Sequence, residues 1–162
     1  MSIIGIIAVA RNYAIGKGGT LPWHYSSDMK FFKQTTLDNA CAMGYNTWAS
    51  LPKKPLPNRL NIILSRKAHI EPQPNVLIMR DVESVLALEK YLACDLFVIG
   101  GAKTYRAFQD VMDRWIVTHV PLVVEDADTF MPKDFLNGFE VERTQELEEN
   151  LVVKFYAEAA VS

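Results

Sequence analysis

The plainest structural signal in this sequence lies at Val98-Ile99-Gly100-Gly101-Ala102-Lys103-Thr104-Tyr105. An apolar run typical of a buried strand ends in two glycines, and a helical pattern begins at once. Glycines let a backbone approach a ligand closely, and a helix N-terminus offers free N–H groups to a phosphate. The third glycine of the full dinucleotide fingerprint is missing. The stretch therefore predicts a strand, a tight turn and a helix, and the turn either binds a phosphate or only connects the two elements.

Similar apolar runs recur along the rest of the chain. They are Ile3 to Ala10, Asn61 to Leu64, Val76 to Ile78 and Leu96 to Ile99. Because these runs are apolar on both faces and rich in Ile and Val, we expect strands of a mainly parallel sheet that helices cover on both sides.

Helical patterns fall between these runs. Ser26 or Ser27 is expected to cap a helix that ends near Thr36, Asp81 is expected to cap a second helix, and a third starts at Gly101. The apolar positions of these helices are Met29, Phe32, Val82, Val85, Leu86, Tyr105, Phe108 and Met112. Met29 and Phe32 fall on neighbouring turns of the first helix. Val82, Val85 and Leu86 are expected to face inward on the second helix, and Tyr105, Phe108 and Met112 share one side of the third.

The C-terminal part changes character. Residues 139–146 and 151–158 are extended candidates joined through Glu148-Glu149-Asn150, which predicts an antiparallel hairpin. The expected fold class is α/β: a three-layer domain whose central, mainly parallel sheet is closed by this C-terminal antiparallel hairpin, with helices on both faces. No repeat or linker divides the sequence, so we expect a single domain over residues 1–162. Ligands should bind at the carboxyl ends of the strands.

The composition is that of an ordinary globular protein. Of 162 residues 49% are hydrophobic, which supplies enough apolar surface to offset chain entropy, and the net charge of -2 favours neither nucleic acid nor a membrane surface as partner. The apolar run at the start follows no positive segment and is shorter than the roughly twenty residues of a membrane span. Cys41 and Cys94 lie in apolar contexts. We expect buried free thiols, not a disulfide, and hence a cytoplasmic protein.

Two further strand ends carry groups suited to a nucleotide. From Ala42 to Trp48 a strand meets a glycine and a short helix, where Thr47 either donates a hydroxyl to a pyrophosphate or only caps the helix. Leu64-Ser65-Arg66-Lys67 closes another strand with a hydroxyl and two cations. A guanidinium there can bind a phosphate through two N–H groups, and the alternative is an exposed basic turn without a ligand.

Asp28 and Arg59 are the candidate partners of an organic substrate. Asp28 lies in the first turn of the expected helix, close to Trp23 and Phe32, where it either complements the helix dipole or forms a carboxylate pressed against aromatic groups. In the second case it could accept paired N–H bonds from an amidine-like heterocycle. Arg59 follows a proline-fixed loop and suits a planar carboxylate, unless it is only a surface residue.

Other chemistries lack their signatures. The three histidines are scattered, with no paired spacing of metal ligands, so no metal site is expected. The sequence also contains neither a Gly-x-Ser-x-Gly elbow nor a Walker phosphate loop, which argues against a serine hydrolase and an NTPase.

Taken in order, these segments resemble the dihydrofolate reductases across essentially the whole chain. The motifs that carry the resemblance are Ile15-Gly16, Leu21-Pro22-Trp23, Asp28, Phe31-Phe32-Lys33, Met43-Gly44, Thr47-Trp48, Pro55-Leu56-Pro57, Arg59, Asn61-Ile62-Ile63-Leu64-Ser65-Arg66, Ile99-Gly100-Gly101, Tyr105, Thr118-His119, Asp128-Thr129 and Pro132. Each is weak alone, and their common order and spacing make the signal specific.

The resemblance implies a role for each matching position. Asp28 would bind N3 and the 2-amino group of the pteridine and support protonation at N5, with Thr118 in the same network. Arg59 would clamp the glutamate α-carboxylate, Trp23 would hold a water near the reaction centre, and residues 16–21 would form a flap. The catalytic residues implied are Asp28, Trp23, Thr118 and Tyr105. The substrate-binding residues implied are Ile6, Asp28, Met29, Phe32, Lys33, Leu51, Leu56, Arg59 and Thr118.

The cofactor that the resemblance implies is NADPH. The positions implied to bind it are Ala8, Ile15, Gly16, Gly44, Tyr45, Asn46, Thr47, Leu64, Ser65, Arg66, Lys67, Ile99, Gly100, Gly101, Ala102, Lys103, Thr104 and Tyr105. Many bacterial members have a basic residue directly after the Met-Gly pair, where it meets the 2′-phosphate, and this chain has Tyr45 there. The 2′-phosphate would then rest on Ser65 and Arg66, with Lys67 as a further candidate.

The expected activity is the reduction of dihydrofolate to tetrahydrofolate by hydride transfer from NADPH, in a monomer that antifolates inhibit. A pyrimidine reductase of the riboflavin pathway is one alternative, because it shares the fold and cofactor, but it would not require Asp28, Phe32 and Arg59 in one pocket. A non-catalytic module is the other alternative, and it would bind NADPH or folate without turnover.

Overall fold

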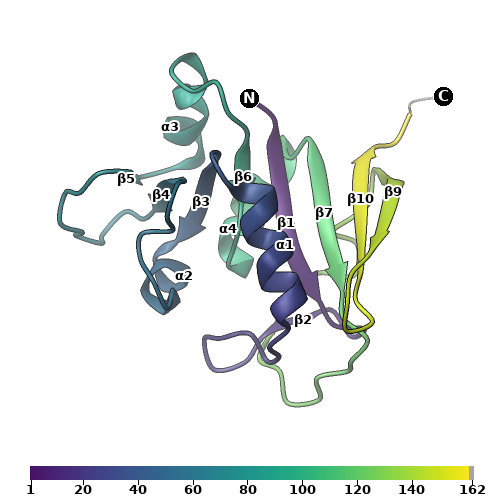
Figure 1. The fold of residues 1–162 in the computed structure, drawn as a ribbon. Helices are drawn as coiled ribbons and strands as arrows, with labels where there is room; N and C mark the ends of the chain where they lie inside the picture. The colour runs from purple at the N-terminus through teal and green to yellow at the C-terminus, as the bar shows by residue number, and fades with distance from the viewer. Residues whose placement is uncertain (161–162) are drawn as a thin grey trace.

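The apolar runs build one eight-stranded sheet. In the computed structural model, which describes residues 1–160, its strands stand in the order β5-β4-β3-β6-β1-β7-β10-β9 (Figure 1). Their bounds are β1 (Ile3–Val9), β3 (Ala40–Gly44), β4 (Leu60–Leu64), β5 (Val76–Met79), β6 (Leu96–Val98), β7 (Arg114–His119), β9 (Phe139–Glu146) and β10 (Val152–Glu158). The six strands from β5 to β7 pair in parallel, and β10 pairs antiparallel with β7 and β9. The parallel sheet and the C-terminal hairpin are confirmed. Residues 161–162 of the expected domain lie outside the described residues.

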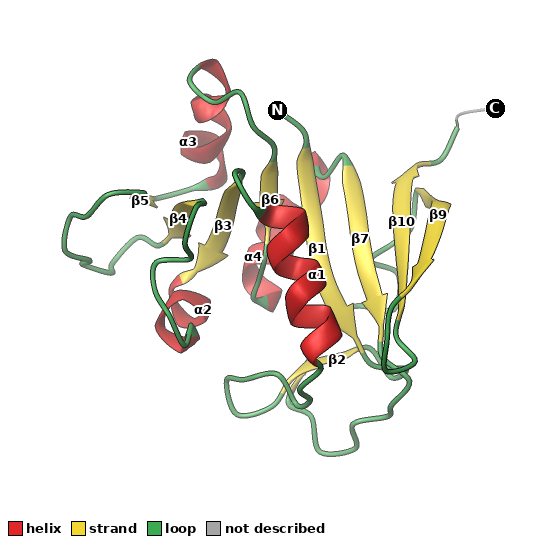
Figure 2. Ribbon diagram, in the orientation of Figure 1, coloured by secondary structure: helices red, strands yellow, loops and turns green. Residues whose placement is uncertain are grey.

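Helices cover both faces of this sheet. They are α1 (Ser26–Thr36), α2 (Tyr45–Ser50), α3 (Val82–Leu86) and α4 (Ala102–Phe108). In Figure 2, α1 crosses the near face and α4 lies behind the sheet. Phe31 of α1 and Trp48 of α2 belong to one buried cluster, and Val85 of α3 and Phe108 of α4 belong to the other. The three layers are therefore confirmed. Among residues 1–160, no helix combines the length and the apolar character needed to cross a bilayer.

The central strand β1 is buried on both sides because successive side chains point to opposite faces. Ile7 packs in the cluster that contains Phe108 of α4, called here the α4-side cluster. Ile6 packs in the cluster that contains Phe31 of α1, the α1-side cluster. Gly5 faces Trp115, whose ring atom Cε3 would lie 2.4 Å from a Cβ added at position 5. The α4-side cluster therefore has room for the indole only because residue 5 lacks a side chain.

The start of α1 differs from the sequence prediction. The cap residue is Tyr25, and neither Ser26 nor Ser27 accepts a capping hydrogen bond. Instead the backbone N–H of Ser27 donates to a carboxylate oxygen of Glu149 at 2.9 Å, and the Ser27 hydroxyl donates to the Glu148 carbonyl at 3.0 Å. The predicted serine cap is wrong because a carboxylate from the β9–β10 turn satisfies the free N–H group in its place. By contrast, Asp81 caps α3 as expected, accepting from Ser84 N at 2.8 Å.

Three elements escaped the sequence patterns. Strand β7 has only three apolar residues in a row, between Arg114 and Thr118, so its pattern is too short to single out. Strands β2 (Ala14–Gly16) and β8 (Thr129–Phe130) pair antiparallel in a separate small sheet. They are three and two residues long and form only because the fold brings two distant loops together.

The cysteines were expected to be buried free thiols. Both are free, and Cys41 is fully buried on β3. Cys94 is only half-buried, so the expectation is wrong for this residue. It lies in the loop before β6, where the chain runs partly along the surface.

Candidate functional site

A carboxylate and a hydroxyl meet beside the central strands. Asp28 comes from the first turn of α1 and Thr118 from β7, and the Thr118 hydroxyl donates to Asp28 Oδ1 at 2.8 Å. Burial raises the pKa of Asp28, and the hydrogen bond from Thr118 opposes part of this rise. A carboxyl whose pKa is raised by desolvation can hold or release a proton closer to neutral pH. The pair is therefore a candidate for both ligand anchoring and proton handling.

A buried phenol lies in the same region but comes from the opposite face of the sheet. The hydroxyl of Tyr105, on α4, donates to the backbone carbonyl of Ile6 on β1 at 2.7 Å. Burial strongly raises the pKa of Tyr105, and the nearby charge of Asp28 raises it further. The phenol therefore stays protonated and presents a neutral ring beside the central strand.

Trp23 lies in the segment that leads into α1. Its indole Nε1 is the one buried side-chain polar atom, among residues 1–160, that finds no hydrogen-bond partner in the protein. Buried donors are normally satisfied by protein, ligand or ordered water. This position therefore suits a polar group outside the chain.

Several of the apolar residues expected to contact the substrate pack against one buried cluster. Phe32, Leu51 and Leu56 are partly buried and pack against the same apolar cluster as Trp48. Met29 and Lys33 lie on the exposed side of α1, where Met29 is 54% exposed. Of the residues expected to contact the substrate, Phe32, Leu51 and Leu56 are therefore packed against the protein, whereas Met29 and Lys33 are exposed.

Arg59 is buried, which excludes the alternative that it is an ordinary surface residue. Only 5% of its surface is exposed, and its guanidinium carbon lies 5.9 Å from the ring centroid of Phe32. Burial lowers the pKa of Arg59, and no carboxylate pairs with it among the described residues. A buried cation without a counter-ion carries an uncompensated desolvation penalty. An anionic ligand would supply the missing partner.

The two glycine turns found in the sequence lie side by side. The N–H of Gly44 donates to the carbonyl of Gly100 at 2.9 Å. A Cβ added at Gly44 would lie 2.8 Å from the Thr104 hydroxyl, and one added at Gly100 would lie 3.7 Å from the Thr47 hydroxyl. Gly44, not Thr47, is the cap residue of α2. The glycines leave a cradle between the starts of α2 and α4 that side chains would fill, which fits a pyrophosphate.

A groove of about 370 Å³ continues beyond the strand ends. It is lined by Leu64, Ser65, Arg66, Arg80, Asp81, Val82 and Ala107. The sequence patterns did not single out Arg80, although the signal was there: it follows β5 as Ser65 follows β4, and the two strands pair with Leu64 opposite Met79. Hydrogen bonds from Ser84 lower the pKa of Asp81, and Arg66 and Arg80 add to this effect. Two guanidinium groups and a hydroxyl together suit a phosphate.

The remaining expected cofactor residues are spread around this surface. Tyr45, Asn46, Lys67 and Lys103 are exposed, and neither Tyr45 nor Lys67 lines the groove. Ala8 and Ile99 are half-buried at the ends of β1 and β6, and Ile15 and Gly16 belong to β2.

The segment 16–21, which was expected to form a flap, is joined to the β8 side by hydrogen bonds. The N–H of Gly18 donates to Asp128 Oδ2 at 2.7 Å, and Asp128 N donates to the carbonyl of Gly16 at 3.1 Å. Lys17 also forms an ion pair with Asp126. The bond from Gly18 is the main reason for the lowered pKa of Asp128. Residues 17–21 are exposed, and these bonds join the segment to the loop before β8.

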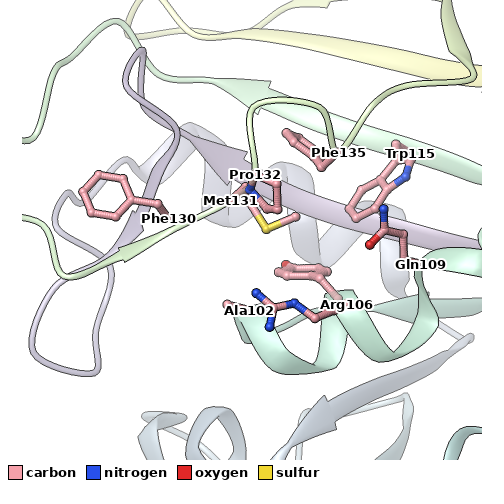
Figure 3. A pocket seen from close by; sticks show the side chains of 9 residues that line it. Ala102, Arg106, Gln109, Trp115, Phe130, Met131, Pro132 and Phe135 are labelled. Carbon is pink, nitrogen blue, oxygen red and sulfur yellow. The ribbon is translucent and has the colours of Figure 1, made fainter.

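A second pocket, against α4, is too small for an organic ligand. Figure 3 shows Arg106 of α4 and Gln109, which directly follows α4, opposite Met131 and Phe135, and Ala102 also lines the space. The pocket encloses about 20 Å³, which is room for one water molecule. Residues 1–160 also contain no group of three or more His, Cys, Asp or Glu placed to hold a metal ion.

Comparisons with known proteins agree on one family. A family model described as dihydrofolate reductase matches residues 2–158. The dihydrofolate reductase of Neisseria gonorrhoeae is 38% identical over 151 residues, which cover 90% of this chain and 88% of that protein. The Saccharomyces cerevisiae enzyme is 34% identical, covering 80% of this chain and 72% of that protein. Among solved structures, Enterococcus faecalis dihydrofolate reductase complexed with NADP(H) and RAB-propyl is 27% identical with a TM-score of 0.86, and the match covers 98% of this chain and 97% of that one.

Proposed function

Since the chain belongs to the dihydrofolate reductase family, we propose that Asp28 and Thr118 anchor the pteridine of dihydrofolate in the buried site beside β1 and β7. The protein is an NADPH-dependent oxidoreductase that reduces dihydrofolate to tetrahydrofolate. The family match favours this reaction over a riboflavin-pathway pyrimidine reductase and over a non-catalytic binding module. The observation that carries the assignment of roles is the Asp28–Thr118 hydrogen bond at 2.8 Å.

Asp28 holds one edge of the pteridine. Thr118 donates to Oδ1, and a carboxylate oxygen has more than one acceptor position, so both oxygens remain able to accept from N3 and the 2-amino group. Its raised pKa lets the carboxyl share a proton with the bound ring, which supports protonation at N5. The indole N–H of Trp23 is free to orient a water at the same end of the pocket.

Arg59 and the apolar walls bind the rest of the substrate. Phe32, Leu51 and Leu56 contact the ring systems, with Ile6, Met29 and Lys33 completing the proposed set. Arg59 takes the glutamate α-carboxylate as the counter-ion that the protein itself does not provide. This arrangement excludes water from the aromatic part of the site and keeps one charged anchor at each end.

The residues present fit NADPH. Gly44, Thr47, Gly100 and Gly101 form the cradle for the pyrophosphate, and Tyr105 and Ile6 lie beside the nicotinamide position. When bound, the cofactor supplies the hydride. The groove with Ser65, Arg66 and Arg80 takes the 2′-phosphate. Arg80 thus supplies the second positive charge, in place of the basic residue that many bacterial members have where this chain has Tyr45.

The 2′-phosphate assignment is tested with Arg66→Ala, Arg80→Ala and the exposed neighbour Lys67→Ala as a matched control. Each loss of a guanidinium should raise the KM for NADPH roughly tenfold or more, because hydrogen bonds between charged groups are among the strong ones. The KM for NADH, which lacks the phosphate, should change less than about twofold on the same reasoning. Equal effects on both cofactors, or an effect of Lys67→Ala as large as the others, would overturn the assignment.

The anchoring assignment is tested by initial rates of NADPH oxidation with dihydrofolate for Thr118→Val and Thr118→Ser. Thr118→Ser keeps the donor to Asp28 and should stay close to the parent protein, whereas Thr118→Val should bind dihydrofolate more weakly. Identical behaviour of the two variants would sink the proposed network. A turnover that needs NADPH but prefers a riboflavin-pathway aminopyrimidine would instead revive the pyrimidine reductase alternative.

We further propose that the protein is a single-domain, cytoplasmic monomer whose site is inhibited by diaminopyrimidine antifolates. One continuous eight-stranded sheet supports the single domain, and two free cysteines support a reducing compartment. The buried carboxylate of Asp28 supports antifolate binding, because a protonated diaminopyrimidine can pair with it. Sedimentation of the full chain tests the monomer, and competition of such an inhibitor against dihydrofolate tests the site.

A further inference from the structure

The guanidinium of Arg59 is held at two of its nitrogens. Nε donates to the carbonyl of Pro57 at 3.0 Å, and Nη1 donates to the hydroxyl of Thr36 at 3.2 Å. Nη2 makes no hydrogen bond to residues 1–160. Of its five N–H donors the protein thus uses two, and three remain for a ligand. A planar carboxylate needs two of them.

The Thr36 hydroxyl is itself fixed. Thr36 is the last residue of α1 and is fully buried, and its single hydroxyl proton is donated to the carbonyl of Phe32 at 2.8 Å. An oxygen whose proton is committed in this way can only accept from Arg59. The same residue therefore connects the turn that carries Phe32 to the cation that lies over the Phe32 ring.

Among residues 1–160, no side chain other than Thr36 accepts a hydrogen bond from the guanidinium. Cys41, on β3, is fully buried close to Thr36 and Arg59, and burial raises its pKa to about 12 although both neighbours oppose the shift. The thiol is therefore neutral at physiological pH and offers no charge to Arg59. Thr36 is the one side-chain acceptor that the described residues place on the guanidinium.

We propose that Thr36 is a positioning residue that sets the plane of the Arg59 guanidinium, so that its remaining donors meet the substrate α-carboxylate as a pair. This inference rests on the proposed role of Arg59 as the carboxylate clamp. Because Pro57 and Thr36 hold the Arg59 side chain, it loses its conformational freedom when the protein folds and not when the substrate binds. Less ordering entropy then opposes the capture of the carboxylate.

The test compares Thr36→Val, which keeps the shape but removes the acceptor, with Thr36→Ser, which keeps the hydroxyl. Each is assayed with dihydrofolate and with dihydropteroate, which has the same rings but no glutamate. Thr36→Val should raise the KM for dihydrofolate roughly tenfold, the usual scale of one hydrogen bond to a charged group, with kcat within about twofold. The KM for dihydropteroate should stay within about twofold, and Thr36→Ser should recover most of the loss on the same scale.

Arg59→Lys separates the inference from its premise, because lysine keeps the charge but not the paired donors. Loss of discrimination between the two substrates in Arg59→Lys together with an unaffected Thr36→Val would overturn the inference alone. An Arg59→Lys variant that weakens both substrates equally would overturn the clamp itself. Equal weakening of both substrates by Thr36→Val would also refute positioning. NADPH affinity reports folding, and Thr36→Ala provides the same comparison if the valine variant does not bind the cofactor.

Discussion

Replacing Asp28 with asparagine removes a charge and a proton while keeping the shape of the site. The amide oxygen can still accept the Thr118 hydroxyl, which lies 2.8 Å from Oδ1, so the local packing should persist. The rate of dihydrofolate reduction near neutral pH should fall roughly a hundredfold to ten-thousandfold, the usual scale of one acid–base group. That range corresponds to about 3 to 5 kcal/mol of activation free energy. NADPH binding should be unchanged, because no charged cofactor contact is altered.

The same variant should be more stable than the parent protein at neutral pH. Burial raises the pKa of Asp28 above its ordinary value of 3.8, so the native state binds this proton more tightly than the unfolded chain. The group's contribution to the free energy of unfolding is therefore present below 3.8 and is lost as pH rises through the raised pKa. The asparagine amide does not titrate, so the variant escapes this loss. Each kcal/mol of relief should raise Tm by roughly 2–4 °C for a chain of this size.

Two measurements decide between these outcomes: single-turnover rates of reduced-nicotinamide loss across pH, and thermal unfolding of both proteins across the same range. The parent rate should fall as pH rises through the raised pKa of Asp28, and the variant should lose this dependence. The difference in Tm should shrink as pH is lowered towards 3.8. A variant with a parental rate at neutral pH, or with a Tm lower than the parent at every pH, would refute the reasoning.

Two further outcomes are expected from the packing and from the flap. Gly5→Ala should lower the free energy of unfolding by about 3 kcal/mol, the upper part of the usual range for overpacking, because its Cβ would lie 2.4 Å from a ring atom of Trp115. Urea unfolding measures it, and a loss within error of zero would mean that the indole moves aside. Asp128→Ala removes the acceptor of Gly18 N and should speed tryptic cleavage after Lys17 in the native protein. NADPH should slow that cleavage if the flap closes over the cofactor, and an unchanged cleavage rate would show that the other bonds suffice.

Local patterns in the sequence were enough for most of the secondary structure. The turn from strand to helix at 98–105 is where β6 ends and α4 begins, and Asp81 caps α3 as its position indicates. These features depend on apolar periodicity, on glycine and on capping side chains a few residues away. The parallel sheet follows from strands that are apolar on both faces.

Local patterns failed where the partner is distant. The sequence shows two serines before α1, yet Glu149 supplies the acceptor across a separation of 122 residues. Arg80 follows an ordinary short strand, and only the pairing of β4 with β5 places it beside Arg66. The apolar run of strand β7 is too short to predict a strand, although β7 carries Thr118.

The sequence by itself determined which chemical groups this protein has and where most of its strands and helices start and end, because both depend on residues that are near neighbours along the chain. The tertiary structure alone decided which groups meet and how dry their surroundings are. Asp28 and Thr118 are 90 residues apart and become partners through strand crossovers. The sequence leaves open whether Arg59 is a ligand-binding or a surface cation, and its burial beside Thr36 follows from the tertiary packing. Burial and long-range contacts arise from the whole arrangement of the chain, so no short stretch of sequence contains them.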